Sequence, residues 1–364
     1  MDKVKVLVLG AGGAAGINFI KCLKMSGKKF FSGPEYYVVA ADMNKYHVIL
    51  PDYDEFEITS HCQREQYPEQ LLTIIKRHNI DFVHAQPDVE VEELGKLRGV
   101  ADAAGARTLL PNQGTIVTCR NKLKTYEKLK LNKVPVPESY PIAEISEIPE
   151  RFNRLLVGNF WVWVRAITGA GSRASLPAQT PEQMLNWVYY WISMKKMDVK
   201  QFMMCEFLPG PEYAWQSVWY HGKLVCSQAR ERLEYYLGNL SVTGQSSSPS
   251  VARTIHNSEV NKIAFNAVKA IDKDATGIFC VDLKTNMRGI PCVTEINAGR
   301  FFTTSNFFAE LGCNMPDIYV NLGMGLNIDE LMLHKKTDVC PKDKYWIRQP
   351  DCEPVMADGS EFND

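Results

Sequence analysis

The segment Thr294-Glu295-Ile296-Asn297-Ala298-Gly299-Arg300 carries the chemistry from which the fold and function of this chain can be interpreted. It follows a strand-like run, 277–283, and a turn that contains Gly289. Two such runs joined by a glycine-containing loop predict a β-hairpin. Alternate side chains of a strand share a face, so Glu295 and Asn297 should point the same way, with Asp282 of the partner strand beside them.

Two carboxylates and an amide oxygen on one face form a hard-oxygen site that suits Mg²⁺, which usually keeps water and substrate phosphates as its other ligands. Arg300, directly after the strand, could clamp a phosphate or a carboxylate. The alternative is a solvated acidic hairpin, because acidic residues are common on exposed strand faces. The rest of the chain has to separate these two interpretations.

Composition predicts a cytoplasmic globular protein. The 364 residues, 45% of them hydrophobic, can bury a large core and should form roughly two or three domains. The net charge of −1 favours neither nucleic acid nor an anionic membrane as a partner. No apolar run approaches the roughly 20 residues that span a bilayer, and we expect no signal peptide. Ten cysteines without a Cys-x-x-Cys pair fit a reducing compartment and predict no zinc site.

Strand and helix signals alternate over roughly the first hundred residues, which predicts a parallel sheet with helices on both faces. The expected strands there are 4–9, 36–41 and 80–85, with a strand-like 107–110 after them, and the expected helices are 17–25 and 67–78. Further along we expect helices at 114–132, 181–195, 259–271, 314–322 and 329–333, and strands at 160–165, 202–208, 213–220 and 223–230. The polar segment after Lys335 should be a C-terminal tail with a frayed terminus.

The glycine-rich turn from Gly10 to Gly16 follows the first strand. It admits a dinucleotide-binding interpretation, in which Asp42 at the end of the second strand binds a ribose hydroxyl. A tight strand-to-helix connection also needs small residues, so the pattern leaves both explanations open. A nicotinamide-dependent oxidoreductase is therefore one candidate function.

Two segments in the middle of the chain could bind a nucleotide. Arg165 ends a strand and precedes the small-residue loop 166–173, whose backbone N–H groups could cradle phosphates. The strand 202–208 stops at Pro209-Gly210-Pro211, so backbone groups of Glu206 and Leu208 could read a purine ring at an exposed edge. Read alone, each segment can also be an ordinary turn.

A third segment combines cations with a polar loop. Arg230 and Arg232 precede the loop 238–248, an arrangement that suits an anionic substrate beneath a mobile cover. A charged strand end beside a solvated loop is the alternative.

The order of these parts resembles the ATP-grasp superfamily, in particular one half of the carbamoyl-phosphate synthase large chain and its stand-alone relatives, over about residues 3–330. The resemblance implies an α/β chain, α+β in its catalytic part, with an ATP-grasp fold after a Rossmann-like pre-ATP-grasp domain. The implied parts are a Rossmann-like domain at 1–112, a small lid subdomain at 113–200, a catalytic subdomain at 201–335 and a C-terminal tail at 336–364.

The resemblance also implies a role for each matching residue. The ATP phosphates would be held by Lys122, Arg165 and the loop residues Ala170, Gly171 and Ser172. Adenine would contact Glu206 and Leu208, and the ribose would contact Glu212. One or two Mg²⁺ ions, for which Mn²⁺ could substitute, would be bound by Asp282, Glu295 and Asn297. Catalysis would rest on Lys122, Arg165 and Arg300, the last of which would steady an acyl phosphate.

The implied activity is an ATP- and Mg²⁺-dependent ligation, in which a carboxylate is activated as an acyl phosphate and attacked by an amine. The partners would be an amino acid or other small carboxylate and an amine, with Gly12 and Asp88 or Glu90 bordering the acceptor, and relatives are often homodimers. The segment 241–248 lacks the His of the synthase, which puts bicarbonate chemistry in doubt. An NAD(P)-dependent oxidoreductase and a non-catalytic ATP-binding module remain the alternatives.

Overall fold

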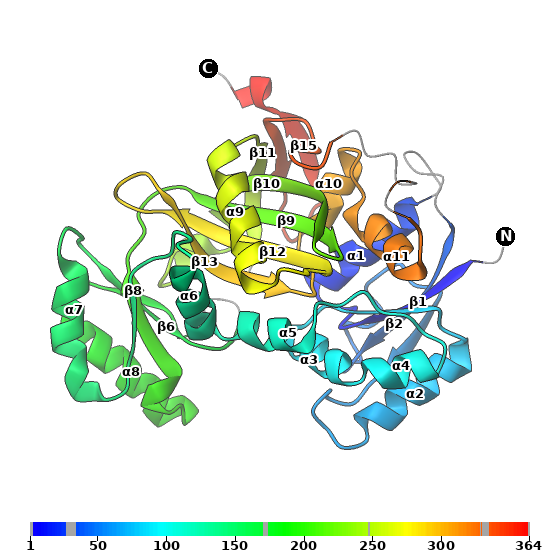
Figure 1. Ribbon diagram of the computed structural model, residues 1–364, viewed down its shortest axis with the longest axis horizontal. Coiled ribbons are helices and arrows are strands. Elements are labelled where there is room, and N and C mark those ends of the chain that lie inside the picture. Colours follow the sequence, from blue (N-terminus) through cyan, green and yellow to red (C-terminus); the bar gives the residue numbers. More distant parts are fainter. Residues whose placement is uncertain are drawn as a thin grey trace.

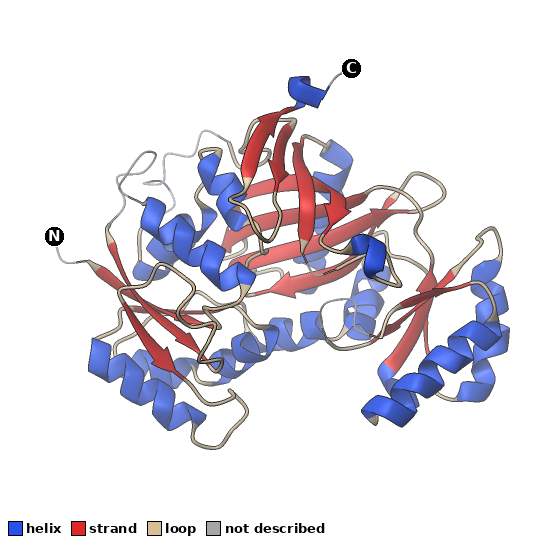
Figure 2. Cartoon of the chain, turned by 180° about the vertical axis from the view of Figure 1, so that it is seen from behind, coloured by secondary structure: helices blue, strands red, loops and turns tan. Residues whose placement is uncertain are grey.

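The structure is a computed structural model that describes residues 3–26, 34–169, 174–246, 248–327, 329 and 335–362. Three β-sheets with helices around them make up this part of the chain (Figure 2). The large sheet lies in the middle, the N-terminal sheet at one end and a small sheet with its two helices at the other (Figure 1). None of the described helices is long and apolar enough to cross a membrane.

The N-terminal sheet is parallel throughout and has the strand order β3-β2-β1-β4. Its strands are β1 (Val4–Leu9), β2 (Tyr36–Asp42), β3 (Glu55–Ile58) and β4 (Phe82–Ala85). The helices are α1 (Ala14–Met25), α2 (Tyr67–His78), α3 (Asp88–Lys96) and α4 (Arg98–Ala103). The apolar run of β1 is buried, as a parallel strand covered on both faces requires. The expected strand 107–110 is reduced to a single bridge between Arg107 and Phe82.

The small sheet is antiparallel, with the order β5-β8-β6-β7. It consists of β5 (Ser139–Pro141), β6 (Val162–Ala166), β7 (Leu176–Ala178) and β8 (Phe202–Glu206), packed against α7 (Ile148–Leu156) and α8 (Pro181–Lys195). The expected boundary at 200 assigned the last of these strands to the catalytic subdomain. In the structure it pairs with β5 and β6, because its alternate residues Phe202 and Met204 complete the core of the small sheet.

The large sheet is antiparallel, with the order β13-β12-β9-β10-β11-β14-β15. Its strands are β9 (Glu212–Tyr220), β10 (Lys223–Tyr235), β11 (Pro249–Ile255), β12 (Gly277–Thr285), β13 (Pro291–Ala298), β14 (Lys344–Ile347) and β15 (Val355–Asp358). The helix α9 (Ser258–Ile271) packs on one face. The expected tail after Lys335 is therefore part of the large sheet, because its two short strands continue the sheet and bury Trp346, and the terminal residues 363–364 lie outside the described residues.

The helix expected at 114–132 is two helices, α5 (Gln113–Arg120) and α6 (Lys122–Leu131). Asn121 separates them with an extended backbone, and its side chain accepts a hydrogen bond of 2.9 Å from Lys124 N–H. An N-cap residue of this kind starts a new helix. The break places Lys122 in the first turn of α6. The described residues also include four short 3₁₀ segments, at Ile145–Glu147, Val199–Gln201, Gly238–Leu240 and Gly359–Phe362.

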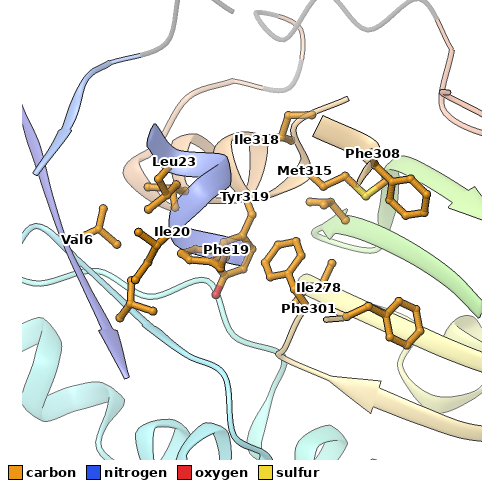
Figure 3. Close-up of a cluster of buried hydrophobic side chains, with 14 of the residues drawn as sticks. Val6, Phe19, Ile20, Leu23, Ile278, Phe301, Phe308, Met315, Ile318 and Tyr319 are labelled. Atoms are coloured by element: carbon orange, nitrogen blue, oxygen red, sulfur yellow. The ribbon is translucent and has the colours of Figure 1, made fainter. Parts of the chain in front are cut away.

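One hydrophobic core joins the N-terminal sheet to the large sheet (Figure 3). Phe19 and Ile20 of α1 meet residues of α10 (Ser305–Glu310) and α11 (Met315–Met324), including Tyr319, together with Ile278 of β12. Phe301 sits among them, and its ring centroid lies 5.4 Å from that of Phe19. This core fixes the position of the segment that follows β13, where Arg300 lies.

Candidate active site

A cavity of about 800 Å³ lies where the three sheets approach one another. All the predicted site residues that the structure describes line it: Lys122, Arg165, Glu206, Leu208, Glu212, Asp282, Glu295, Asn297 and Arg300. The remaining three, Ala170, Gly171 and Ser172, lie outside the described residues. The roles of these residues stay predictions, but the sequence correctly indicated that they belong to one place.

The hairpin of β12 and β13 places its polar side chains as the alternation predicts. Asp282 is directly opposite Glu295 in the antiparallel register, and Asn297 lies two residues further along the same face. Asn297 Nδ2 donates a hydrogen bond of 3.3 Å to Asp282 Oδ2. Two carboxylates and one amide oxygen thus face the same part of the cavity.

Two cations converge on the Glu295 carboxylate. Arg165 Nη2 donates to Glu295 Oε2 at 3.0 Å, and Lys122 Nζ lies 3.4 Å from the same oxygen. Burial alone would raise the pKa of Glu295, but the charges of Lys122, Arg165 and Arg300 outweigh it and hold the pKa to about 2. Lys122 also donates to Gly169 O at 2.6 Å, which ties α6 to the loop that begins the predicted phosphate-binding segment.

Asp282 and Glu212 share a third cation, Arg232. Arg232 donates one bond to each carboxylate, the one to Glu212 Oε1 being 3.0 Å long. Burial raises the pKa of Asp282 in spite of this pairing, with a further contribution from the charge of Glu295. Burial also tends to raise the pKa of Glu212. The charges of Arg232 and Lys284 outweigh this effect, so the pKa of Glu212 is lowered.

Glu212, the predicted ribose acceptor, is already fully engaged. Besides Arg232 it accepts a hydrogen bond of 2.7 Å from Gln245 Nε2 and one from the Tyr235 hydroxyl, and Lys284 Nζ lies 3.6 Å away. A ribose at this position would have to displace Gln245, which lies in the polar loop after β10. The sequence reasoning missed these partners. Lys284 could have been found, since it lies two residues beyond Asp282 on the same strand face.

Arg300 connects the hairpin to the N-terminal part of the chain. Its guanidinium donates to Asn297 Oδ1 and to the carboxylate of Asp88 at the start of α3. Gly299 before it has a φ of +93°, and a Cβ there would lie 2.6 Å from Val91 Cγ1, so this turn requires glycine. Asp88 lines the cavity, as expected for a residue that borders the acceptor. Gly12, which was expected to border the acceptor as well, and Glu90, the alternative to Asp88, do not line the described part of that cavity.

The expected exposed edge at Glu206 is wrong. β8 is flanked by β5 and β6, and Glu206 N–H donates a 2.7 Å hydrogen bond to Glu138 O. Leu208 lies two residues beyond the end of the strand and is buried against the cavity, beside Phe207 and Trp163. At this end of the cavity, the chain thus leaves the small sheet only after Glu206, in the segment that contains Leu208.

The dinucleotide interpretation of the N-terminal turn receives no support from the geometry. Both carboxylate oxygens of Asp42 accept backbone hydrogen bonds, 2.9 Å from Gly12 N–H and 2.8 Å from Asn44 N–H. A Cβ on Gly12 would lie 2.5 Å from His47, so the chain itself packs closely on this turn. The glycines therefore serve a tight connection, and a ribose would have to break both bonds of Asp42.

The hairpin donors fit a hard divalent cation. Among the described residues no group of three or more His, Cys, Asp or Glu side chains is arranged to hold a metal. The set of Asp282, Glu295 and Asn297 has two carboxylates and an amide oxygen, which suits an ion that takes its remaining ligands from water and phosphate.

Comparisons with known proteins agree with this geometry. A family model described as an ATP-grasp domain matches residues 119–304. No curated protein matches the sequence. Among solved structures, L-amino acid ligase from Bacillus licheniformis superposes with a TM-score of 0.67 at 14% identity, over 95% of this chain and 79% of that one. Biotin carboxylase from Campylobacter jejuni in complex with β,γ-ATP superposes with a TM-score of 0.67 at 13% identity, over 95% of this chain and 75% of that one. Carboxyaminoimidazole ribonucleotide synthase from Aspergillus clavatus complexed with ATP superposes with a TM-score of 0.66 at 15% identity, over 95% of this chain and 81% of that one. At these identities the superpositions establish a shared fold.

Proposed function

Because this chain belongs to the ATP-grasp domain family, we propose that it is an ATP- and Mg²⁺-dependent ligase that joins a substrate carboxylate to an amine. The observation that carries the proposal is the arrangement of charge around Glu295. Lys122 is buried and Arg165 is half-buried, and both cations share this one carboxylate. Such a group can exchange a protein anion for the phosphates of a nucleotide without leaving either cation unpaired.

In the nucleotide complex Lys122 and Arg165 would turn to the phosphates, and Glu295 would become a metal ligand with Asp282 and Asn297. Bound there, Mg²⁺ would neutralise charge on the β- and γ-phosphates. Phosphoryl transfer depends mostly on positioning and charge stabilisation, so these side chains need not provide a nucleophile. Leu208, beyond the end of β8, would border the adenine.

The substrate carboxylate would lie near Arg300, on the side of the hairpin that faces Asp88. A carboxylate oxygen attacks the γ-phosphorus and the bond to the leaving oxygen of ADP breaks, which gives an acyl phosphate. The amine then attacks the acyl carbon, phosphate leaves with the bonding electrons, and the amine nitrogen loses a proton. The segments 166–173 and 238–248, of which 170–173 and 247 lie outside the described residues, would form the cover that keeps water from the acyl phosphate.

The substrates would be an amino acid or other small carboxylate and an amine, as the name of the L-amino acid ligase suggests. We further propose that the enzyme works as a cytoplasmic homodimer and that its parts correspond to the four expected domains, with β8 transferred to the small subdomain. The cysteines are free thiols, which fits a reducing compartment.

The test is a screen for ADP release with Mg²⁺-ATP against a panel of amino acids, small carboxylates and amines. A ligase should release ADP only when an acid is present, and the product should contain both organic partners by mass spectrometry. Mg²⁺-dependent ATP binding without ADP release for any pair would instead identify a non-catalytic module. Binding of NADPH that is lost in Asp42→Ala would favour an oxidoreductase.

A further inference from the structure

One charged side chain of the cavity has no role in the arrangement described above. Arg230 of β10 lines the cavity and is only 1% exposed. Its Nε and Nη1 atoms have no hydrogen-bond partner in the part of the chain that the structure describes. The guanidinium instead lies over two aromatic rings, 4.7 Å from the centroid of Phe302 and 5.9 Å from that of Phe308.

Every other cation that lines the described cavity is paired with an acid. These pairs are Arg120–Glu92, Lys122–Glu295, Arg165–Glu295, Arg232–Asp282, Arg232–Glu212, Lys284–Glu212 and Arg300–Asp88. Arg348, buried beside this region, bonds to neutral groups, including Pro249 O at 2.9 Å and Ser248 Oγ at 2.7 Å. Arg230 and Arg348 thus give this side of the cavity an excess of positive charge.

A buried cation without a counter-ion is costly in the free protein. Burial, reinforced by the charges of Arg232 and Arg348, lowers the pKa of Arg230 to about 9. Cation–π contacts offset part of this cost, and an apolar side chain of the same length could make the same packing contacts with the rings. The charge therefore weakens the free protein and gains a partner only when an anion enters the cavity.

The register of the large sheet places Arg230 relative to the hairpin. Glu295 is opposite Asp282, Asp282 is opposite Ala214 of β9, and Ala214 is opposite Arg230. Residues opposite one another share a face, so these four form a row across the sheet. With strands about 4.8 Å apart, the backbone of Arg230 lies roughly 10 Å from that of Asp282 and roughly 14 Å from that of Glu295.

We propose that Arg230 binds a second anionic group of the acid substrate, a carboxylate or a phosphate, at the end opposite to the carboxylate that is activated. Ser248 and Thr303 line the cavity on this side and would border that group. A planar guanidinium suits either anion because it can donate two parallel hydrogen bonds. The inference rests on the proposed ligase function and narrows its acid to molecules that carry two anionic groups.

The test compares wild type with Arg230→Met, which keeps the length of the side chain and its packing but removes the charge. The probes are glutarate, its half-amide glutaramate, and 3-phosphonopropionate, each added to the protein with ADP and Mg²⁺ and followed by thermal shift. Glutarate or the phosphonate should raise the melting temperature of wild type and glutaramate should not, and this difference should vanish in Arg230→Met. The preferred diacid identifies which anion the site takes.

In the ligase assay, KM for the diacid should rise about 100-fold in Arg230→Met, equal to about 2.7 kcal/mol, while the dissociation constant of ATP changes by less than about twofold. The ligand-free variant should melt at the same temperature as wild type or higher. The matched control is Arg253→Met on β11, whose arginine pairs with Glu231 at 2.7 Å and does not line the described cavity. It should melt lower than wild type and leave KM unchanged.

Three results would overturn the inference. Equal thermal shifts from glutarate and glutaramate would show that no second anion is recognised. A 100-fold loss of ATP affinity in Arg230→Met would assign the arginine to the nucleotide phosphates. A lower melting temperature with unchanged KM would make it structural. If glutarate shifts wild type but no acid supports ADP release, the anion site stands and the ligase proposal fails.

Discussion

Replacing Glu295 with Gln removes the charge on which Lys122 and Arg165 converge and keeps the size of the side chain. In the free protein this leaves the buried Lys122 and the half-buried Arg165 without their shared counter-ion. We therefore expect Glu295→Gln to destabilise the nucleotide-free protein at pH 7.

The magnitude follows from the pKa of Glu295, which its cationic neighbours lower from 4.5 to about 2. At about 1.4 kcal/mol for each pH unit, the charged form contributes about 3 kcal/mol to stability. The side chain is 19% exposed, so solvent screens this contribution only in part, and loss of one partner of a buried pair typically costs about 3–5 kcal/mol. At about 2–4 °C for each kcal/mol, the melting temperature should fall by about 6–12 °C.

The dependence on pH has a definite sign. The folded-state pKa of this carboxyl is depressed, so its contribution is present above about pH 4.5 and is lost as the pH falls towards 2. Melting curves of wild type and Glu295→Gln should accordingly differ most near neutral pH and approach one another in acid.

Nucleotide binding gives a second readout of the same change. Isothermal calorimetry should show that wild type binds Mg²⁺-ATP more tightly than ATP in EDTA. In Glu295→Gln the cations are free and a metal ligand is missing, so metal-free ATP should bind at least as tightly as in wild type and the gain from Mg²⁺ should disappear.

The matched control is Glu231→Gln, a half-buried acid on β10 that pairs with Arg253 and does not line the described cavity. It should lose some stability and keep the full Mg²⁺ effect. An unchanged melting temperature in Glu295→Gln, together with the wild-type gain from Mg²⁺, would refute the assignment of Glu295 as a counter-ion and metal ligand.

Four further substitutions test other parts of the structure. Lys122→Met should weaken ATP binding by about 10- to 100-fold, since it removes a charged hydrogen-bond donor, and calorimetry measures this directly. Gly10→Ala should lower the free energy of unfolding by about 2–4 kcal/mol, because φ is +65° and the new Cβ would lie 2.3 Å from Pro87. Gly99→Ala, in open space on α4, should raise it by about 0.5–1 kcal/mol, and urea titration compares the two. Burial, with a smaller contribution from the charge of Asp42, raises the pKa of Glu90 to about 7. The free energy of unfolding of wild type should therefore decrease as the pH rises from about 4.5 to 7. Glu90→Gln should reduce this decrease.

The hairpin could be predicted from sequence because its information is local. Strand alternation places Glu295 and Asn297 on one face whatever surrounds them, and the glycine-containing turn brings Asp282 beside them. The break at Asn121 was also present in the sequence, since Asn is a strong helix-capping residue. A continuous helical pattern on both sides of it favoured the single helix.

The remaining features depend on contacts between distant segments. No local pattern pairs Arg300 with Asp88, which lie 212 residues apart in the chain. The same holds for β14, a strand of only four residues that extends the large sheet because it pairs with the edge of β11. Strand pairing also determines that the strand from Phe202 to Glu206 belongs to the small sheet. The sequence of this strand alone does not encode that choice.

Arg230 and Arg232 illustrate what a sequence pattern can and cannot predict. Two residues apart on one strand, they look equivalent in the sequence, and both suggest an anionic ligand. The structure separates them, because Arg232 faces Glu212 and Asp282 whereas Arg230 faces aromatic rings and further cations. A charge that is neutralised within the protein stabilises the ligand-free fold. A charge that is buried without a counter-ion stabilises the protein only when an anionic ligand is bound. The difference between the two arginines is therefore what directs the search for the substrate to acids with a second anionic group.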